Sequence, residues 1–306
     1  MPNNKRLITI VGATAIGKTS MSIALAKHYH CDIISCDSRQ FYKEMRIGTA
    51  VPTKEELAQV THYFIQDRSI FEPYSVGQFE KEALDLLDQL FKTQDTVIMV
   101  GGSGLYVDAV LKGLDYFPPV DPQVRTNLNI QLEQNGIETL QAELEYLDPI
   151  TYASIDIQNP HRLIRALEIC KGTENIYSNY KNRPKAPRNF KSIVIGLDAP
   201  RPTIYSRIEQ RVDIMMSEGL LKEARRLYPY RELNALQTVG YRELFSYFDG
   251  EFTLEFAVSE IKKNTRRFAK RQNTWFKKDK TTLWFDYQAD YKEIVAKIDS
   301  INTALF

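Results

Sequence analysis

Residues 7–19 read LITIVGATAIGKT, and this stretch decides the fold of the 306-residue chain. Its first part, Leu7–Val11, is a continuous apolar run rich in β-branched residues, which is typical of a strand buried on both faces. A glycine-containing turn follows, and a helical pattern then runs from Lys18 to His28. The stretch therefore predicts a strand, a glycine loop and a helix in direct succession.

The loop fits the phosphate-binding pattern G-x-x-x-x-G-K-[ST] and has the strand and helix that this pattern requires. Its members are Gly12, Ala13, Thr14, Ala15, Ile16, Gly17, Lys18 and Thr19. Backbone N–H groups between the two glycines form an anion-binding nest at a helix N-terminus. Lys18 adds a positive charge, and the Thr19 hydroxyl is a candidate ligand of Mg²⁺. We therefore expect a P-loop that binds phosphate; the alternative is a glycine turn that binds nothing.

Short apolar segments alternate with helical patterns along most of the chain. The further strand candidates are Cys31–Cys36, Thr96–Val100, Ser192–Leu197 and Thr282–Phe285. Ser75 and Gln78 form a capping-box pattern before a helix that we expect to run to Phe91. This alternation predicts an α/β fold with a P-loop, doubly wound parallel sheet core. Residues 121–187 instead are helical in pattern and end in a loop-like segment, so we expect a helical insertion domain between core segments 1–120 and 188–306.

Positive charge is concentrated in one segment near the end of the chain. Residues 262–280 contain nine Lys or Arg and only one acidic residue, Asp279, so the segment has a net charge of +8 in a chain of net charge +1. Phe268, Trp275 and Phe276 lie among these basic residues. Basic residues interleaved with aromatics suit nucleic acid. The alternative is an amphipathic helix whose aromatic side chains pack in the core.

Several classes of protein do not fit the sequence. No apolar run is long enough to span a bilayer, and residues 1–6 are polar where a secretory signal would be apolar. We therefore expect a cytoplasmic protein without a membrane partner. The three cysteines include no CxxC pair, and the four histidines show no ligand spacing, so neither a disulfide framework nor a zinc site is indicated.

Asp37 follows the second strand candidate, at the edge of a parallel sheet where ligands bind. Three roles are open for its carboxylate. It could hold Mg²⁺ as the acidic residue of a P-loop NTPase does, act as a general base, or cap the N-terminus of a helix.

Four other groups are candidates for binding anions or nucleic acid. They are Gly101–Gly104 with Ser103, the pair Arg162 and Arg165 after Asn159-Pro160, the pair Arg207 and Arg211, and the segment Gln237–Arg242. For each arginine pair the alternative is a solvated or salt-bridged helix face, and for Ser103 it is a simple helix cap.

Together these motifs resemble the bacterial tRNA dimethylallyltransferase family, also called tRNA isopentenyltransferases. The matching strings are GATAIGKTS, DIISCDSRQFYKEMRIGTAVPT, PYSVGQFEKEA, VIMVGGSGLYVDAVLKGL, NPHRLIRALE, RIEQRVDIMMSEGLLKEA, TVGYRE and TRRFAKRQNTWFKK. They occur in the family's order and cover the chain from residue 9 to about residue 278. P-loop kinases do not share the string from Asp32 to Thr53.

The resemblance implies a transferase that moves a dimethylallyl group from dimethylallyl diphosphate to N6 of an adenosine. That adenosine lies on the 3′ side of the anticodon in tRNAs that read codons beginning with U. The P-loop would hold the diphosphate with Mg²⁺, for which Thr19 is the expected ligand. Asp37 matches the general base, and Thr19 and Arg211 complete the expected catalytic set.

The resemblance also implies a contact set for the tRNA anticodon stem-loop. Its members are Asp37, Ser38, Arg39, Gln40, Ser103, Arg125, His161, Arg162, Leu163, Ile164, Arg165, Gln237, Thr238, Val239, Gly240, Tyr241 and Arg242. Ser103 stands where the family more usually has Thr, and the hydroxyl is kept. The insertion domain would grip the tRNA, and we expect a monomer.

Three rival functions remain open from the residues alone. A P-loop kinase would turn over ATP, and the P-loop is also an ATP-binding motif. A prenyltransferase acting on free adenine nucleotides would need neither the insertion nor the basic helix. An RNA-binding module with an inactive P-loop would have no need of Lys18, Thr19 and Asp37 together.

Overall fold

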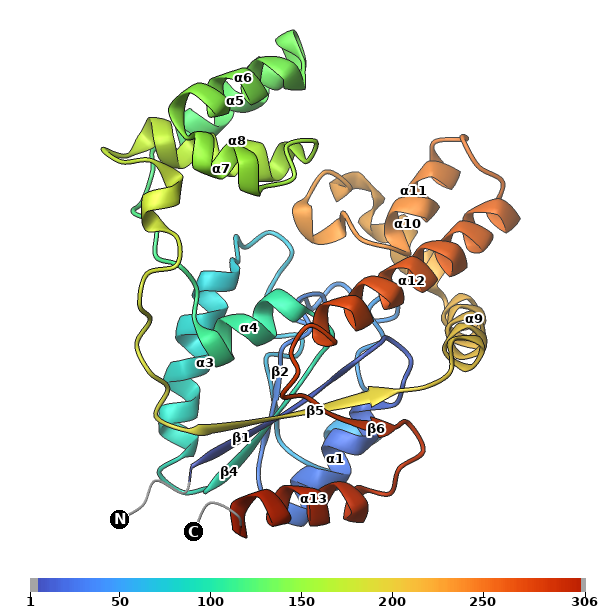
Figure 1. Cartoon of the computed structure of the whole chain (residues 1–306). Helices are drawn as coiled ribbons and strands as arrows, with labels where there is room; N and C mark the ends of the chain where they lie inside the picture. Colours follow the sequence, from blue (N-terminus) through green and yellow to red (C-terminus); the bar gives the residue numbers. More distant parts are fainter. Residues whose placement is uncertain (1–4, 304–306) are drawn as a thin grey trace. The chain divides into compact units, whose positions relative to one another are not determined.

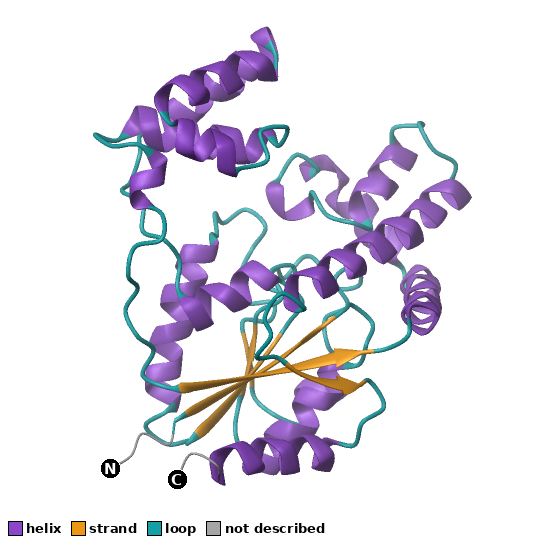
Figure 2. Cartoon of the chain, in the orientation of Figure 1, coloured by secondary structure: helices purple, strands orange, loops and turns teal. Residues whose placement is uncertain are grey.

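The computed structural model describes residues 5–303. Its six-stranded sheet has the strand order β3-β2-β4-β1-β5-β6. Helices lie around this sheet (Figures 1 and 2). The strands are β1 (Arg6–Gly12), β2 (Ile33–Ser35), β3 (His62–Tyr63), β4 (Thr96–Val100), β5 (Lys191–Asp198) and β6 (Leu283–Asp286). All five pairings are parallel. The predicted α/β doubly wound sheet is confirmed.

Alternate residues of β1 pack on opposite faces of the sheet. Ile8 and Ile10 lie in a core with α1 (Lys18–Tyr29) and α13 (Tyr291–Thr303). Leu7 and Val11 lie in a second core with α3 (Val76–Leu90) and α4 (Gly104–Lys112). All four β1 side chains are fully buried. Helices thus cover both faces, which explains why the β1 sequence is apolar at every one of these positions.

Two local predictions need correction. The strand expected over Cys31–Cys36 pairs only over Ile33–Ser35, and the two-residue strand β3 was not predicted. A strand of two residues leaves no periodic pattern in the sequence.

The predicted capping box of α3 is present, because the Ser75 hydroxyl accepts the Gln78 N–H at 3.2 Å and the Gln78 side chain accepts the Ser75 N–H at 2.8 Å.

A third core lies among helices of the C-terminal half. These helices are α9 (Arg201–Ser217), α10 (Leu220–Leu227), α11 (Tyr241–Phe248) and α12 (Leu254–Phe276). Their buried side chains include Val212, Leu220, Tyr241, Leu244 and Ile261. The long helix α12 also contacts α4 and β1, so it joins this helical layer to the sheet.

Residues Gly113–Pro187 form a compact unit of their own, and residues 1–112 and 188–306 form the other unit. The smaller unit consists of α5 (Pro122–Asn135), α6 (Ile137–Leu147), α7 (Pro149–Ser154), α8 (Pro160–Gly172) and a 3-10 turn, η1 (Tyr177–Tyr180). Leu128, Leu140, Leu144, Leu163 and Leu167 form its core. Asn159 caps α8 through its side chain, and Pro160 is the first residue of this helix.

None of the helices between residues 5 and 303 combines the length with the apolar character that crossing a bilayer requires.

Candidate active site

The P-loop connects β1 to α1 and adopts the backbone that an anion nest needs. Ala15 has φ 63° and Gly17 has φ 108°, so both lie in the left-handed region. Gly17 is the N-cap of α1 and provides no side-chain cap, which leaves the first N–H groups of the helix open. Gly12 cannot carry a side chain, because a Cβ there would lie 2.5 Å from the Leu197 carbonyl oxygen. The strand, loop and helix predicted from the sequence are therefore all present.

Lys18 is folded onto its own loop. Its Nζ donates to the Gly12 carbonyl at 3.1 Å and to the Ala13 carbonyl at 2.8 Å. Burial lowers the pKa of Lys18 to about 8, although Asp37 opposes that shift. The amine is thus held by weak neutral acceptors in a poorly solvated place. An anion bound in the loop would stabilise the charged form of the amine.

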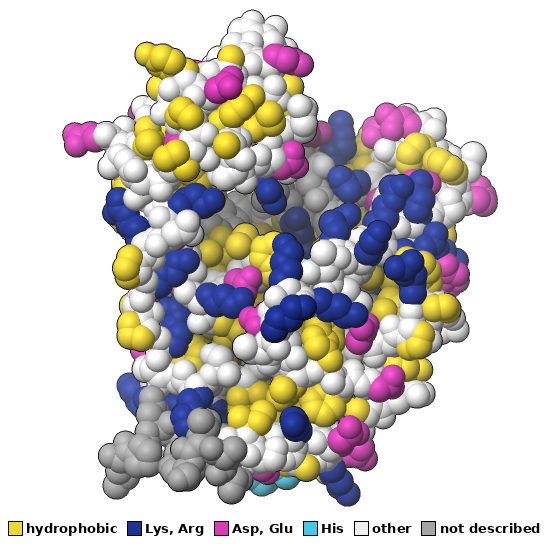
Figure 3. Space-filling model, in the orientation of Figure 1, with side chains coloured by type: hydrophobic (Ala, Val, Ile, Leu, Met, Phe, Trp, Pro, Cys, Tyr) yellow, Lys and Arg dark blue, Asp and Glu magenta, His cyan; other side chains and the backbone are white. Residues whose placement is uncertain are grey.

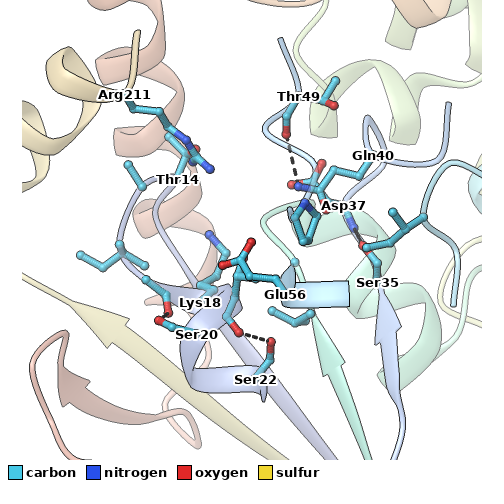
Figure 4. A pocket seen from close by; sticks show the side chains of 18 of the residues that line it. Thr14, Lys18, Ser20, Ser22, Ser35, Asp37, Gln40, Thr49, Glu56 and Arg211 are labelled. Carbon is cyan, nitrogen blue, oxygen red and sulfur yellow. Dashed lines mark hydrogen bonds between the residues drawn. The ribbon is translucent and has the colours of Figure 1, made fainter. Parts of the chain in front are cut away.

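A cavity of about 470 Å³ opens over this loop, and we call it the phosphate cavity (Figure 4). Side chains from several elements line it. They include Thr14, Lys18, Thr19, Ser22, Ser35, Asp37, Gln40, Thr49, Glu56, His62, Arg207 and Arg211. The described residues contain no cluster of three His, Cys, Asp or Glu that could hold a metal ion without a ligand's help.

Both arginines predicted on the helix after β5 contact the P-loop. Arg211 Nη1 donates to Thr14 Oγ1 at 3.1 Å, and Arg207 Nε donates to the Ala15 carbonyl at 2.7 Å. Burial lowers the pKa of Arg211, and the nearby Asp37 carboxylate opposes this shift. Arg207 remains an exposed residue while Arg211 is half-buried, so the solvated-face alternative is excluded for Arg211 alone. The arginines place positive charge beside the nest, where it can neutralise a phosphate group.

Asp37 lies two residues beyond β2 and faces the phosphate cavity (Figure 4). Its Oδ1 accepts the Arg39 N–H at 3.2 Å and so closes a turn. No helix begins at this point, since the next helical residue along the chain is Lys54. The helix-cap alternative for Asp37 is therefore wrong. The carboxylate keeps further lone pairs that a substrate proton or a cation could use.

A second cavity of about 480 Å³ adjoins the first, and we call it the base cavity. Its lining includes Ser38, Arg39, Ser103, Thr238, Val239, Gly240, Arg242, Phe268, Arg271, Gln272 and Trp275. Thr14, Asp37, Thr49 and Arg211 line both cavities. Asp37 and Arg211 thus stand where a group in the phosphate cavity could meet a group in the base cavity.

Hydrogen bonds hold the wall between the two cavities in place. The Ser103 hydroxyl accepts the Ser38 N–H at 3.0 Å and lies 3.0 Å from the Ser38 hydroxyl. Arg39 donates to the carbonyls of Asn234 and Ala235, each at 3.0 Å. Gln40 donates to the carbonyls of Thr49 and Ala50 at 3.2 and 3.0 Å. Arg39, Gln40 and Ser103, which are all predicted tRNA contacts, therefore already form hydrogen bonds within the protein.

The segment Gln237–Arg242 divides between surface and core. Gln237 and Arg242 are exposed, and both line the base cavity. Tyr241 is fully buried, and its hydroxyl donates to Glu223 Oε1 at 2.7 Å. The Tyr241 side chain therefore packs inside the protein, and the contact of this residue with tRNA stays a prediction. The TVGYRE string gave no sign of this, since the buried partner Glu223 lies 18 residues away.

Within the insertion unit, α8 presents polar residues and buries apolar ones. His161 and Arg162 are exposed. Leu163 and Ile164 are buried in the helical core, so neither offers its side chain to RNA, and their contacts with tRNA stay predictions. An amphipathic helix with this spacing must turn positions 163 and 164 inward once 161 and 162 face outward.

Arg125 and Arg165 share one carboxylate in the same unit. Arg125 donates to Glu168 through Nε at 3.1 Å and Nη2 at 2.7 Å, and Arg165 Nη1 donates to Glu168 at 2.9 Å. Glu168 is buried, yet the side chains of both arginines remain more than 40% exposed. The structure thus presents two oriented arginines at the surface of this unit.

The basic segment lies on α12 and just beyond it, and Figure 3 shows Lys and Arg side chains gathered over this helix. Some of its charges are neutralised, because Lys262, Arg266 and Lys277 pair with Asp213, Glu209 and Asp198. Arg267, Lys270, Arg271 and Lys278 are exposed and make no ion pair with the carboxylates of residues 5–303. Phe276 is buried, whereas Phe268 and Trp275 are each 38% exposed and line the base cavity.

Sequence reasoning missed Thr49, Glu56, Glu223 and Gln272. Gln272 is the most informative of these, because a signal for it existed. It stands on the face of α12 that carries the buried residues Ile261, Ala269 and Phe276. A polar residue at a buried helix position needs hydrogen-bond partners, and that need marks it as a candidate for a specific role.

Comparison with known proteins gives consistent matches over nearly the whole chain. The model of the IPP transferase family matches residues 40–279. The chain is 61% identical over 300 residues to tRNA dimethylallyltransferase of Flavobacterium psychrophilum, covering 96% of this chain and 98% of that one. It is 59% identical over 298 residues to the protein of that name from Christiangramia forsetii, covering 97% and 99%.

Comparison with solved structures also gives matches over nearly the whole chain. The tRNA isopentenylpyrophosphate transferase of Bacillus halodurans matches with a TM-score of 0.71 and 36% identity, covering 98% of this chain and 96% of that chain. A eukaryotic dimethylallyltransferase acting on tRNA matches with a TM-score of 0.77 and 25% identity, covering 92% and 74%. On the family match and on identities near 60% over almost its full length, this chain belongs to the IPP transferase family.

Proposed function

We propose that the chain is a tRNA dimethylallyltransferase. It transfers the dimethylallyl group of dimethylallyl diphosphate to N6 of the adenosine on the 3′ side of the anticodon, in tRNAs that read codons beginning with U. The product is N6-isopentenyladenosine. Such a protein works where tRNA is processed, and we propose the cytoplasm.

One observation carries the proposal: Asp37 and Arg211 line both the phosphate cavity and the base cavity. A prenyl transfer needs an anionic leaving group on one side of the reacting carbon and a nucleophilic amine on the other. The P-loop side offers backbone N–H groups, Lys18 and Arg211 for the diphosphate. The other side offers Phe268 and Trp275, whose faces suit an unstacked base.

Thr19 and Asp37 fit a role in holding Mg²⁺ together with the diphosphate. Mg²⁺ binds hard oxygen ligands and usually combines one or two protein oxygens with substrate phosphates and water. Both side chains line the phosphate cavity, where Glu56 adds a further carboxylate. The cation would supply positive charge that neutralises the leaving diphosphate.

The reaction makes one bond and breaks another. The adenine N6 lone pair forms a bond to C1 of the dimethylallyl group, while the C1–O bond breaks and its electrons leave with the diphosphate. Lys18, Arg211 and the loop N–H groups stabilise that developing negative charge. The Asp37 carboxylate accepts the proton that N6 loses. A tRNA bound over the base cavity would keep out water that competes for the allylic carbon.

Two surfaces suit the anticodon stem-loop. The exposed cations of α12 can neutralise phosphates, and the insertion domain at residues 121–187 offers Arg162, Arg165 and Arg125 for gripping RNA. Neither surface is needed for a free adenine nucleotide, which argues against the prenyltransferase of that class. We propose that the protein acts as a monomer.

The test is to incubate the full chain with Mg²⁺, dimethylallyl diphosphate and a tRNA transcript that reads a UNN codon. Digestion and mass spectrometry should then find isopentenylated adenosine. Parallel reactions use AMP as acceptor and ATP as donor, and one transcript carries guanosine at the target position. Prenylated AMP, or phosphate transfer from ATP without prenyl transfer, would replace the proposal by the corresponding rival function.

A further inference from the structure

Gln272 joins the two glycine loops at the carboxyl edge of the sheet. Its Oε1 accepts the Thr14 N–H at 2.8 Å, and its Nε2 donates to the Gly102 carbonyl at 2.9 Å. The side chain is only 5% exposed. Moving the amide away would leave buried donors and acceptors unpaired, which costs more than the hydrogen bonds themselves contribute. The position of Gln272 is therefore fixed.

The hydrogen bond to Thr14 removes one donor from the anion nest. Thr14 lies between Gly12 and Gly17, inside the segment whose N–H groups bind phosphate oxygens. In this structure its N–H is satisfied by a neutral amide oxygen. That oxygen is itself an acceptor, so it would repel a phosphate oxygen that approached the same N–H. The donors left for an anion begin at Ala15 and continue into α1.

The Gln272 amide also packs closely against the second glycine loop. A Cβ built on Gly102 would lie 2.1 Å from Gln272 Nε2, which shows how tightly the amide packs against this glycine. Thr14 lines both cavities, whereas Gln272 lines only the base cavity. Gln272 therefore lies on the base-cavity side of Thr14, where its amide oxygen holds the Thr14 N–H.

We propose that Gln272 is a specificity-determining residue that limits the P-loop to a diphosphate and excludes the longer chain of a triphosphate. Two phosphate groups can be held by the donors from Ala15 to Thr19 with Lys18 and Arg211. A third group extending toward Thr14 meets the Gln272 amide oxygen and finds no free donor. This inference rests on the proposed function, which assigns a diphosphate to the loop.

The experiment measures the affinities of inorganic diphosphate and inorganic triphosphate, each with Mg²⁺, by calorimetry on the full chain. Triphosphate carries more negative charge, so simple attraction to the cationic loop would favour it. We expect the wild-type protein to prefer diphosphate by at least about tenfold. The Gln272→Ala variant frees the Thr14 N–H and the space beside it. The ratio of triphosphate affinity to diphosphate affinity should therefore rise by about tenfold or more, which is what one hydrogen bond to a charged group contributes.

Two further variants make the result decisive. Gln272→Met keeps the length of the side chain but loses both the acceptor and the donor, so it should shift the ratio in the same direction even if the alanine variant folds poorly. Asn273→Ala changes the neighbouring residue, whose amide bonds to Asp198 outside both cavities, and should leave the ratio unchanged. Thermal melts establish that each variant is folded.

The inference fails if the wild-type protein binds triphosphate as tightly as diphosphate, or if folded Gln272 variants keep the wild-type ratio. Prenyl transfer to tRNA measured on the same wild-type sample separates this failure from failure of the proposed function. Transfer with an unchanged ratio overturns only the role of Gln272. Absence of transfer under conditions that bind diphosphate overturns the proposed function itself.

Discussion

Tyr241 and Glu223 form a buried hydrogen bond of 2.7 Å that fixes a loop beside the active site. The Glu223 carboxylate also accepts the backbone N–H groups of Arg46, Ile47 and Gly48 at 2.9 to 3.1 Å. The next residue, Thr49, lines both cavities. The Glu223 carboxylate on α10 thus holds in place a loop whose Gly48 lies 175 positions earlier in the sequence.

Tyr241→Phe should therefore destabilise the protein by about 1.5–3 kcal/mol, because it removes a hydrogen bond to a charged acceptor and leaves that acceptor buried. Urea unfolding measures the change in the free energy of unfolding. Tyr146→Phe is the matched control, since Tyr146 is 86% exposed and should change stability by less than about 0.5 kcal/mol. Equal stability of the two variants would show that the buried hydroxyl contributes nothing.

Asp37→Asn tests the two roles that the structure leaves open for this carboxylate. As the general base, Asp37 accepts the N6 proton, and its loss should lower kcat by about 10²- to 10⁴-fold while tRNA affinity changes little. As a Mg²⁺ ligand, its loss should instead weaken diphosphate binding, and excess Mg²⁺ should partly restore activity. Measuring kcat, tRNA affinity and Mg²⁺ dependence separates these roles. A fully active Asp37→Asn enzyme would contradict the mechanism.

The pKa of Lys18 predicts a pH dependence of phosphate binding. Burial lowers this pKa to about 8, so the free protein loses the ammonium charge as the pH rises through that value. The affinity for inorganic diphosphate should then fall between pH 7 and pH 9, beyond any change due to titration of diphosphate itself. The Lys18→Arg variant keeps its positive charge at both pH 7 and pH 9, so its affinity for diphosphate should depend on pH less than that of the wild-type protein.

Lys18→Ala should nearly abolish prenyl transfer at every pH, with tRNA binding largely intact. A variant with near-normal turnover at saturating dimethylallyl diphosphate would show that the P-loop amine has no part in the reaction.

Charge reversal on α12 should weaken tRNA binding. Arg267 and Lys270 are exposed and carry no carboxylate partner among residues 5–303, so Arg267→Glu with Lys270→Glu removes charge that RNA phosphates can meet. Each lost phosphate contact should reduce the log–log slope of affinity against salt by roughly 0.7 to 0.9. The comparison is Lys262→Glu, because Lys262 already pairs with Asp213. If the double variant keeps the wild-type slope, this face of α12 does not contact RNA.

The sequence alone determined those features that depend on residues a few positions apart. The P-loop is one, because its glycines, Lys18 and Thr19 must follow a buried strand in a fixed order. The capping box of Ser75 and Gln78 and the N-cap Asn159 are others, since each involves an interaction within one helical turn. The apolar runs of β1 and β4 likewise predicted strands covered on both faces.

Only the tertiary structure decided which side chains serve the site and which serve the core. Leu163 and Tyr241 stand in strings that resemble RNA contacts, yet both are fully buried. Gln272 and Thr14 are 258 positions apart, and no pattern in either segment specifies their pairing. Such a pair forms because the parallel sheet brings β1, β4 and α12 to one edge, where each buried polar atom must find a partner. That partner depends on the packing of distant elements, which local periodicity does not encode.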